Sequence, residues 1–128
     1  MSFVKDFTEL ETYKLAGKIS FEIYQLTKMF PSEEKFSLTD QIRRSSRSVG
    51  AQIAESWGKR RYEKHFISKL TDADAEIMET QHWLATAEEC EYISAEEFNA
   101  LNKQCGILST KINSMILKAN QFCNLNKK

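Results

Sequence analysis

Basic side chains gather in the middle of the sequence, where their chemistry suits the binding of phosphate. Three arginines fall between residues 43 and 47, and a second basic run occupies residues 59–61. The planar guanidinium group donates two parallel hydrogen bonds, a geometry that matches the oxygens of a phosphate. The pattern therefore predicts a nucleic-acid-binding surface made of Arg44, Arg47, Lys59, Arg60 and Arg61.

The acidic segment that follows offers a second role for some of these arginines. Residues 41–64 carry seven basic and two acidic side chains, whereas residues 65–97 carry one basic and nine acidic ones. In an antiparallel helical hairpin that turns near residues 59–60, Arg43 would lie beside Glu76 and Arg47 beside Asp72. We expect these two ion pairs as structural contacts, so Arg47 has two candidate roles.

One short motif matches a metal-binding pattern. Glu79 and His82 form the Glu-x-x-His of di-iron four-helix proteins. A di-iron site needs a second such motif, but Tyr62 stands three residues before the only other histidine, His65. Helical projection also turns Glu79 and His82 away from the apolar face of their helix. We therefore expect no metal site and no cofactor.

Side chains arranged for catalysis are scarce. A serine or cysteine nucleophile needs a base within reach, and the two histidines do not supply one. The four glycines are isolated, so they form no phosphate-binding loop. Asp72 and Asp74 lie two residues apart in a predicted helix, a spacing more typical of a solvated or ion-paired face. The sequence favours a protein that is not an enzyme.

Apolar periodicity predicts four helices that position these residues. Apolar side chains recur at steps of three and four, as one face of a helix requires. The four expected core stripes are Ala16, Ile19, Ile23, Leu26 and Phe30; Leu38, Ile42, Val49, Ile53 and Trp57; Phe66, Leu70, Ala73, Ile77, Leu84 and Ala87; and Phe98, Leu101, Cys105, Leu108, Ile112, Met115, Ala119 and Phe122. Small or polar side chains within the stripes are Ser45, Ser46 and Thr80.

Residue types at the ends of the stripes mark where the helices start and stop. Ser94 and Glu97 match a capping box, Ser37 precedes the second helix, and Gly58 is placed to end it. The connections near residues 31–37, 58–62 and 90–94 are short, which favours antiparallel neighbours. We expect one all-α domain over residues 1–128, an antiparallel up-down-up-down four-helix bundle.

Length, charge and cysteine content narrow the class of protein further. The chain has 128 residues, of which 18 are basic and 18 acidic, so its net charge is zero and exerts no overall attraction for nucleic acid or anionic lipid. Three scattered cysteines without a C-x-x-C pair suit a reducing compartment. No apolar run approaches the roughly 20 residues of a membrane-spanning helix. We expect a soluble cytoplasmic protein with no membrane partner.

Large apolar residues outnumber the places available in one four-helix core. Aromatic residues and methionine outside the core stripes are typical of contacts between subunits. The residues expected at an interface between copies of this chain are Phe21, Tyr24, Met78 and Trp83. This surplus predicts a homo-oligomer but does not set the number of subunits.

One set of residues along the chain matches the pattern of a known family: Phe30, Pro31, Leu38, Gln41, Ile42, Arg43, Arg44, Ser48, Ile53, Ala54, Glu55, Phe66, Leu70, Glu76, Glu79, Thr80 and Gln81. Through these residues the chain resembles, over roughly residues 7–118, the bacterial four helix bundle protein family, also called the 23S rRNA intervening sequence protein family. The resemblance implies a four-helix protomer that assembles as a ring-like homopentamer. One branch, the accessory variability determinant of diversity-generating retroelements, is a basic pentamer that binds nucleic acid and a reverse transcriptase. The zero net charge of this chain departs from that branch.

Two functions follow as alternatives. The first is a non-enzymatic accessory module that binds RNA or DNA through the basic patch at the end of the second helix, with a reverse transcriptase as a partner by analogy. The second is a structural scaffold or protein-interaction module with no nucleic-acid role. The clustered basic residues favour the first function, and the zero net charge favours the second.

Overall fold

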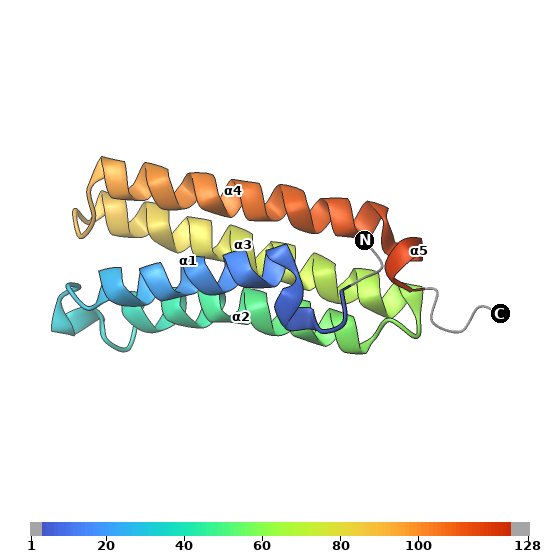
Figure 1. Ribbon diagram of the computed structural model, residues 1–128. Coiled ribbons are helices and arrows are strands. Elements are labelled where there is room, and N and C mark those ends of the chain that lie inside the picture. Colours follow the sequence, from blue (N-terminus) through green and yellow to red (C-terminus); the bar gives the residue numbers. More distant parts are fainter. Residues whose placement is uncertain (1–3, 124–128) are drawn as a thin grey trace.

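The computed structural model describes residues 4–123, which form helices joined by short turns. Four long helices lie side by side: α1 (Glu11–Thr27), α2 (Leu38–Gly58), α3 (Glu63–Glu89) and α4 (Ala95–Leu117) (Figure 1). Three single-turn helices accompany them: η1 (Phe7–Glu9), η2 (Ser32–Glu34) and α5 (Ala119–Phe122). The described residues contain no strand, so the predicted all-α class and the four helices are confirmed. None of these helices is long and apolar enough to cross a membrane.

One continuous apolar core runs through all four long helices. It contains nearly all of the predicted stripe residues, and the predicted polar positions Ser45, Ser46 and Thr80 are buried with them. Four predicted core residues are only half-buried: Leu26, Trp57, Phe98 and Phe122. Each lies at or near the end of a helix, where neighbouring helices cover fewer sides. Leu10 and Ile93, which lie outside the long helices, complete the core.

The beginnings of α4 and α2 are capped by different devices. At α4 the predicted capping box is confirmed: the backbone N–H of Glu97 donates to Ser94 Oγ at 3.0 Å, and the N–H of Ser94 donates to the Glu97 carboxylate at 2.9 Å. At α2 the side chain of Ser37 does not cap the helix. Instead, the Glu34 carboxylate accepts the N–H of Leu38 at 3.2 Å and the hydroxyl of Ser37 at 2.6 Å.

The ends of α2 and α3 also differ from the simplest expectation. Gly58 ends α2 as predicted, but no glycine among the described residues has a positive φ, so its conformational freedom is not what ends the helix. At the end of α3, Glu91 takes a left-handed φ of 65°. A hydrogen bond from the N–H of Tyr92 to the carbonyl of Ala87 at 2.9 Å closes this turn. A non-glycine residue thus occupies the position that glycine normally takes.

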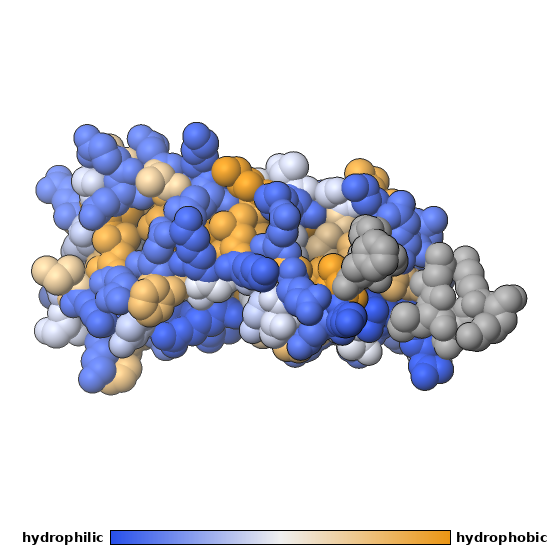
Figure 2. All heavy atoms as spheres, in the orientation of Figure 1, coloured by the Kyte–Doolittle hydropathy of each residue, from blue (hydrophilic) through white to orange (hydrophobic). Residues whose placement is uncertain are grey.

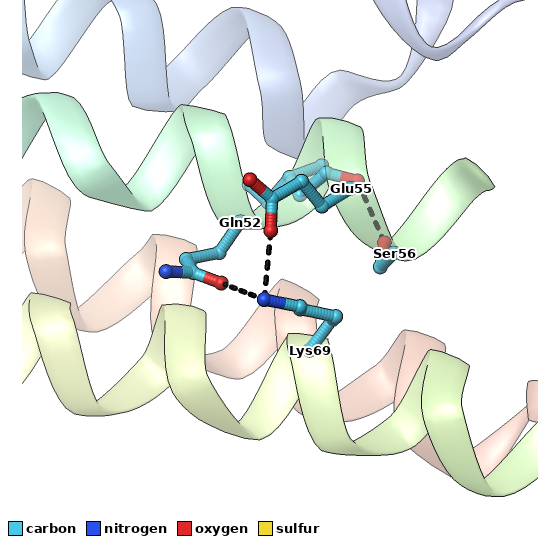
Figure 3. A network of polar contacts seen from close by, with 5 residues as sticks. Gln52, Glu55, Ser56 and Lys69 are labelled. Atoms are coloured by element: carbon cyan, nitrogen blue, oxygen red, sulfur yellow. Dashed lines mark hydrogen bonds and ion pairs between the residues drawn. The ribbon is translucent and has the colours of Figure 1, made fainter. Parts of the chain in front are cut away.

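Polar contacts fix the register of α2 on α3. Ser45 Oγ lies 2.8 Å from Thr80 Oγ1 within the buried interface. Further along, Lys69 reaches from α3 to α2, with its Nζ 2.7 Å from Glu55 Oε1 and 3.3 Å from Gln52 Oε1 (Figure 3). The hydrogen bond from Lys69 lowers the pKa of Glu55, and the same bond raises the pKa of Lys69. Positions 45, 52 and 55 therefore define the flank of α2 that faces α3.

The opposite flank of α2 faces α1. A Cβ atom added at Gly50 would lie 3.8 Å from the Tyr13 ring and 3.9 Å from Cβ of Ala16, so the two helices approach closely at this point. Thr27 of α1 meets Arg43 of α2 nearer the connection between them. Because α2 packs against both α1 and α3, its exposed surface is a narrow strip between the two flanks.

Candidate functional site

A basic pocket opens to solvent beside the first three turns of α2. We call it the arginine pocket; its volume is about 510 Å³, and its lining residues are Lys35, Phe36, Thr39, Asp40, Arg43, Arg44 and Arg47. The connection between η2 and α2 supplies residues 35 and 36. Positions 39, 40, 43, 44 and 47 recur at steps of three and four, so they share one side of the helix. Four basic side chains surround one carboxylate, a composition that attracts anions.

The ring of Tyr24 on α1 holds two of the pocket arginines in place. The guanidinium carbons of Arg43 and Arg47 lie 4.8 and 5.4 Å from its centre, and Lys28 Nζ lies 4.9 Å from it. The Nε of Arg43 also donates to Thr27 Oγ1 at 2.8 Å. Within the described residues, none of these three cations lies within ion-pair distance of a carboxylate. Their positive charge is therefore not neutralised by an ion pair within residues 4–123.

The two ion pairs predicted for Arg43 and Arg47 are not formed. Arg43 contacts α1 rather than Glu76, and Arg47 contacts the Tyr24 ring rather than Asp72. The predicted pairs were derived from the hairpin of the second and third helices alone, whereas α2 also packs against α1. Positions 43 and 47 fall on the flank toward α1, while positions 45, 52 and 55 face α3.

The second basic run lies at the other end of α2. The sixteen residues from Arg44 to Arg60 correspond to about 24 Å along a helix axis, so the sequence cluster forms two separate surfaces. Arg60 is partly buried: its guanidinium carbon lies 3.6 Å from the centre of the Trp57 ring, and its Nε donates to the Trp57 carbonyl at 2.7 Å. Burial lowers the pKa of Arg60. Lys59 and Arg61 remain exposed.

The four residues predicted to contact other copies divide into two groups. Phe21 and Met78 are exposed, at 58% and 60% of their surface. Tyr24 is half-buried under its three cations, and Trp83 is half-buried with its indole N–H donating to Glu79 Oε2 at 3.1 Å. Figure 2 shows further hydrophobic atoms gathered along the band between α1 and α4, framed by hydrophilic side chains.

The Glu-x-x-His residues lie together on the outer side of α3. The carboxylate of Glu79 accepts the Trp83 indole, and the His82 ring centre lies 4.7 Å from that of Trp83. Between residues 4 and 123, no three His, Cys, Asp or Glu side chains come together in a way that could hold a metal ion. Glu79 and His82 therefore both contact Trp83.

Sequence reasoning missed Lys35 and Phe36 as site residues. Phe36 stands one position before the N-cap of α2, where an apolar residue usually packs against the fourth residue of the helix. That residue is Gln41, so the packing partner is absent from the sequence. Phe36 is 86% exposed as a result. The sequence signal for an exposed Phe36 is therefore the polar Gln41 at the position where an apolar partner is normally found.

The fold and pocket define a helical-bundle protein with a cationic groove on one helix. The chain belongs to the 23S rRNA-intervening sequence protein family, whose model matches residues 8–114. A similar solved structure is that of a protein of unknown function from the S23 ribosomal protein family of Bacteroides thetaiotaomicron. It has 29% identity and a TM-score of 0.74, with 83% of this chain and 95% of that chain covered. No curated protein matches.

Proposed function

We propose that this protein is a non-enzymatic accessory module that binds the phosphate backbone of nucleic acid in the arginine pocket. The observation that carries the proposal is the grouping of Lys35, Arg43, Arg44 and Arg47 around one open pocket with a single carboxylate, Asp40. Membership of a family described by a ribosomal RNA insertion is consistent with such a ligand. The proposed site keeps Arg44 and Arg47 of the predicted basic surface, whereas Lys59, Arg60 and Arg61 lie at the other end of α2.

The arginines are presented in a way that suits phosphate. Arg44 is exposed, and its hydrogen bond to Gln41 Oε1 is long, at 3.4 Å, so the guanidinium can turn to a ligand at little cost. Arg43 uses its Nε on Thr27, which leaves both terminal nitrogens for a bidentate contact. Contacts of this kind position a nucleic-acid strand without reading its sequence. Binding should therefore be sequence-independent and should weaken steeply with salt.

The same proposal includes an assembly. Here the protomer is an antiparallel up-down-up-down bundle that forms a ring-like homo-oligomer, with five copies as the family resemblance implies. The pairing of Ser45 with Thr80 and of Gln52 with Lys69 supports the antiparallel order of α2 and α3. The exposed Phe21 supports subunit contacts. A ring repeats the arginine pocket, and linked sites raise avidity without new contacts.

Light scattering coupled to gel filtration tests the assembly. A mass several times the 14.8 kDa of one chain is expected, and Phe21→Asp should reduce it while helicity is kept. Lys103→Asp, on the exposed surface of α4, is the control for an added surface carboxylate. A mass of one chain at micromolar concentration overturns the assembly and leaves the pocket to be tested on its own.

Fluorescence anisotropy with a labelled oligonucleotide tests the binding function. At about 50 mM salt, the wild-type protein should bind RNA or DNA, and Arg44→Glu should weaken the affinity about tenfold or more. Lys103→Glu makes the same charge change far from the pocket and should leave the affinity nearly unchanged. Absence of binding, or equal losses in both variants, overturns the proposal.

The end of α2 is tested separately. Lys59 and Arg61 are the exposed cations there, whereas Arg60 stabilises the helix end through Trp57. Arg61→Glu should lower affinity only if a strand bound at the arginine pocket also reaches this surface. A short oligonucleotide should then be insensitive to Arg61→Glu, and a longer one should be sensitive to it.

A structural scaffold or protein-interaction module is the second candidate function. The zero net charge and the hydrophobic band between α1 and α4 favour it (Figure 2). In this case the oligomer forms, no oligonucleotide binds at low salt, and Arg44→Glu has no effect on any measured property.

A further inference from the structure

Phe36 is exposed to solvent, although hydrogen bonds fix the backbone around it. Its side chain is 86% exposed. The backbone beneath it is fixed on both sides, because Ser37 donates its N–H to the carbonyl of Glu34 at 3.0 Å and its hydroxyl to the Glu34 carboxylate at 2.6 Å. The N–H of Lys35 is likewise bonded to the Ser32 carbonyl at 3.1 Å. A large apolar ring is thus presented to solvent by an ordered turn.

The ring lines the same pocket as the arginines. Phe36 and Lys35 both line the arginine pocket, and Lys35 Nζ lies 5.4 Å from the centre of the Phe36 ring. A flat apolar face therefore stands beside four cations. That combination matches a nucleotide, which has a phosphate and a flat base.

We infer that Phe36 stacks on an unpaired base, so that the arginine pocket selects single-stranded nucleic acid over a duplex. This inference rests on the proposed function. Every base has a face on which an aromatic ring can stack, and stacking is tolerant of sequence. In a duplex these faces are covered by neighbouring base pairs, so only the phosphates of a duplex are accessible to the pocket. The arginines hold either ligand, and Phe36 distinguishes between them.

The arrangement of the charges favours a strand over a lipid surface. Arg43, Arg44 and Arg47 lie within about one turn of α2, and Phe36 lines the same pocket. Glu33, which is exposed, stands three residues before Phe36 and places a negative charge in the same segment, which is unfavourable for docking on an anionic membrane. A compact group of cations with one aromatic ring fits a phosphate and an unpaired base of a single strand.

The test compares one RNA sequence as a single strand and as a duplex with its complement, using anisotropy at low salt. The wild-type protein should bind the single strand about tenfold more tightly than the duplex. Phe36→Ala should lose about tenfold for the single strand and little for the duplex, and Phe36→Trp should restore the preference. Met29→Ala is the matched control, because Met29 is 83% exposed on the same connection but does not line the pocket.

The outcomes separate the inference from the proposed function. If Arg44→Glu weakens both ligands and Phe36→Ala weakens neither selectively, the inference is overturned while phosphate binding stands. If neither ligand binds, both are overturned. If the protein binds phosphatidylserine vesicles through Phe36 and binds no oligonucleotide, the ligand is a lipid surface and the inference is again wrong.

Discussion

The hydroxyl oxygens of Ser45 and Thr80 lie 2.8 Å apart in the buried contact between α2 and α3. Thr80 also donates to the carbonyl of Glu76 at 2.9 Å. Its single hydroxyl proton is used in that bond, so Ser45 is the donor between the two hydroxyls. Among residues 4–123, the other acceptor that the Ser45 hydroxyl reaches is the carbonyl of Ile42, at 3.4 Å. Loss of the bond between the two hydroxyls would therefore leave Ser45 with a poor acceptor, whereas Thr80 would keep its bond to Glu76.

This asymmetry predicts unequal costs for the two substitutions. Thr80→Val should lower the free energy of unfolding by about 1–2 kcal/mol, because it leaves the Ser45 hydroxyl buried with a poor acceptor. Ser45→Ala should cost less, since Thr80 keeps its bond to Glu76. In the double variant the loss should be smaller than the sum. Urea unfolding of the four proteins measures these values, and strict additivity would contradict the prediction.

Stability at high pH should depend on Tyr92. Its hydroxyl donates to Glu34 Oε2 at 2.8 Å, and this bond raises the pKa of Tyr92 from 10.0 to about 12. Because the folded state holds the proton more tightly, the stabilisation is complete below pH 10 and is lost as the pH rises through about 12. Tyr92→Phe should be less stable than the wild type near neutral pH, and the difference should shrink across this window.

Thermal unfolding of both proteins at a series of pH values measures that difference. Tyr62→Phe is the control, because Tyr62 is exposed and its variant should follow the wild type at every pH. A gap between Tyr92→Phe and the wild type that stays constant from pH 8 to the highest accessible pH would count against the role of the phenol.

Replacing Glu91 with glycine should stabilise the protein. The left-handed conformation of Glu91 costs about 1–2 kcal/mol for a residue with a Cβ, and glycine adopts it freely. Part of the gain is lost to the greater freedom of glycine in the unfolded chain, so a net increase of about 1 kcal/mol in the free energy of unfolding is expected. Glu89→Gly, in the last turn of α3, should instead destabilise by about 1 kcal/mol.

The cysteines should react with thiol reagents in a fixed order. Cys90 is exposed, whereas Cys105 is 2% exposed and burial raises the pKa of its thiol to about 11. The thiolate is the reactive form, so Cys105 should be modified only when the protein unfolds. Mass spectrometry of peptides after brief iodoacetamide treatment, with and without denaturant, measures the order. Rapid labelling of Cys105 in the folded protein would contradict the buried position.

The helices could be predicted from the sequence because the residues that are buried recur with the spacing of one helix face. Stripes such as Phe66, Leu70, Ala73 and Ile77 have one apolar face and one polar face, which leaves a single way to bury them. Ser37 precedes α2 as predicted, but the group that caps the helix could not be predicted in the same way. Its cap is the carboxylate of Glu34, three residues upstream of the serine that the local pattern favours.

The candidate site was predicted less well, because the contacts of its side chains depend on how the helices are rotated against one another. Arg43 and Arg47 were correctly placed on the second helix, but their partners depend on which flank of α2 meets α1. Arg60 and Arg61 are neighbours in the sequence, but Arg60 packs on the Trp57 ring whereas Arg61 is exposed, and the sequence does not show this difference. Phe36 falls outside every apolar stripe, so periodicity gave no reason to include it.

The Glu34 carboxylate joins three parts of the chain at one point. It accepts hydrogen bonds from the first turn of α2, from Ser37 and from Tyr92, which lies 58 residues further along. The turn that carries Lys35 and Phe36 is thereby preorganised, so a ligand that meets it need not order the backbone and loses less conformational entropy on binding. The carboxylate also links the turn beside the arginine pocket to Tyr92 in the connection between α3 and α4, so removal of the Tyr92 hydroxyl should loosen the turn that presents Phe36 although Tyr92 does not line the pocket.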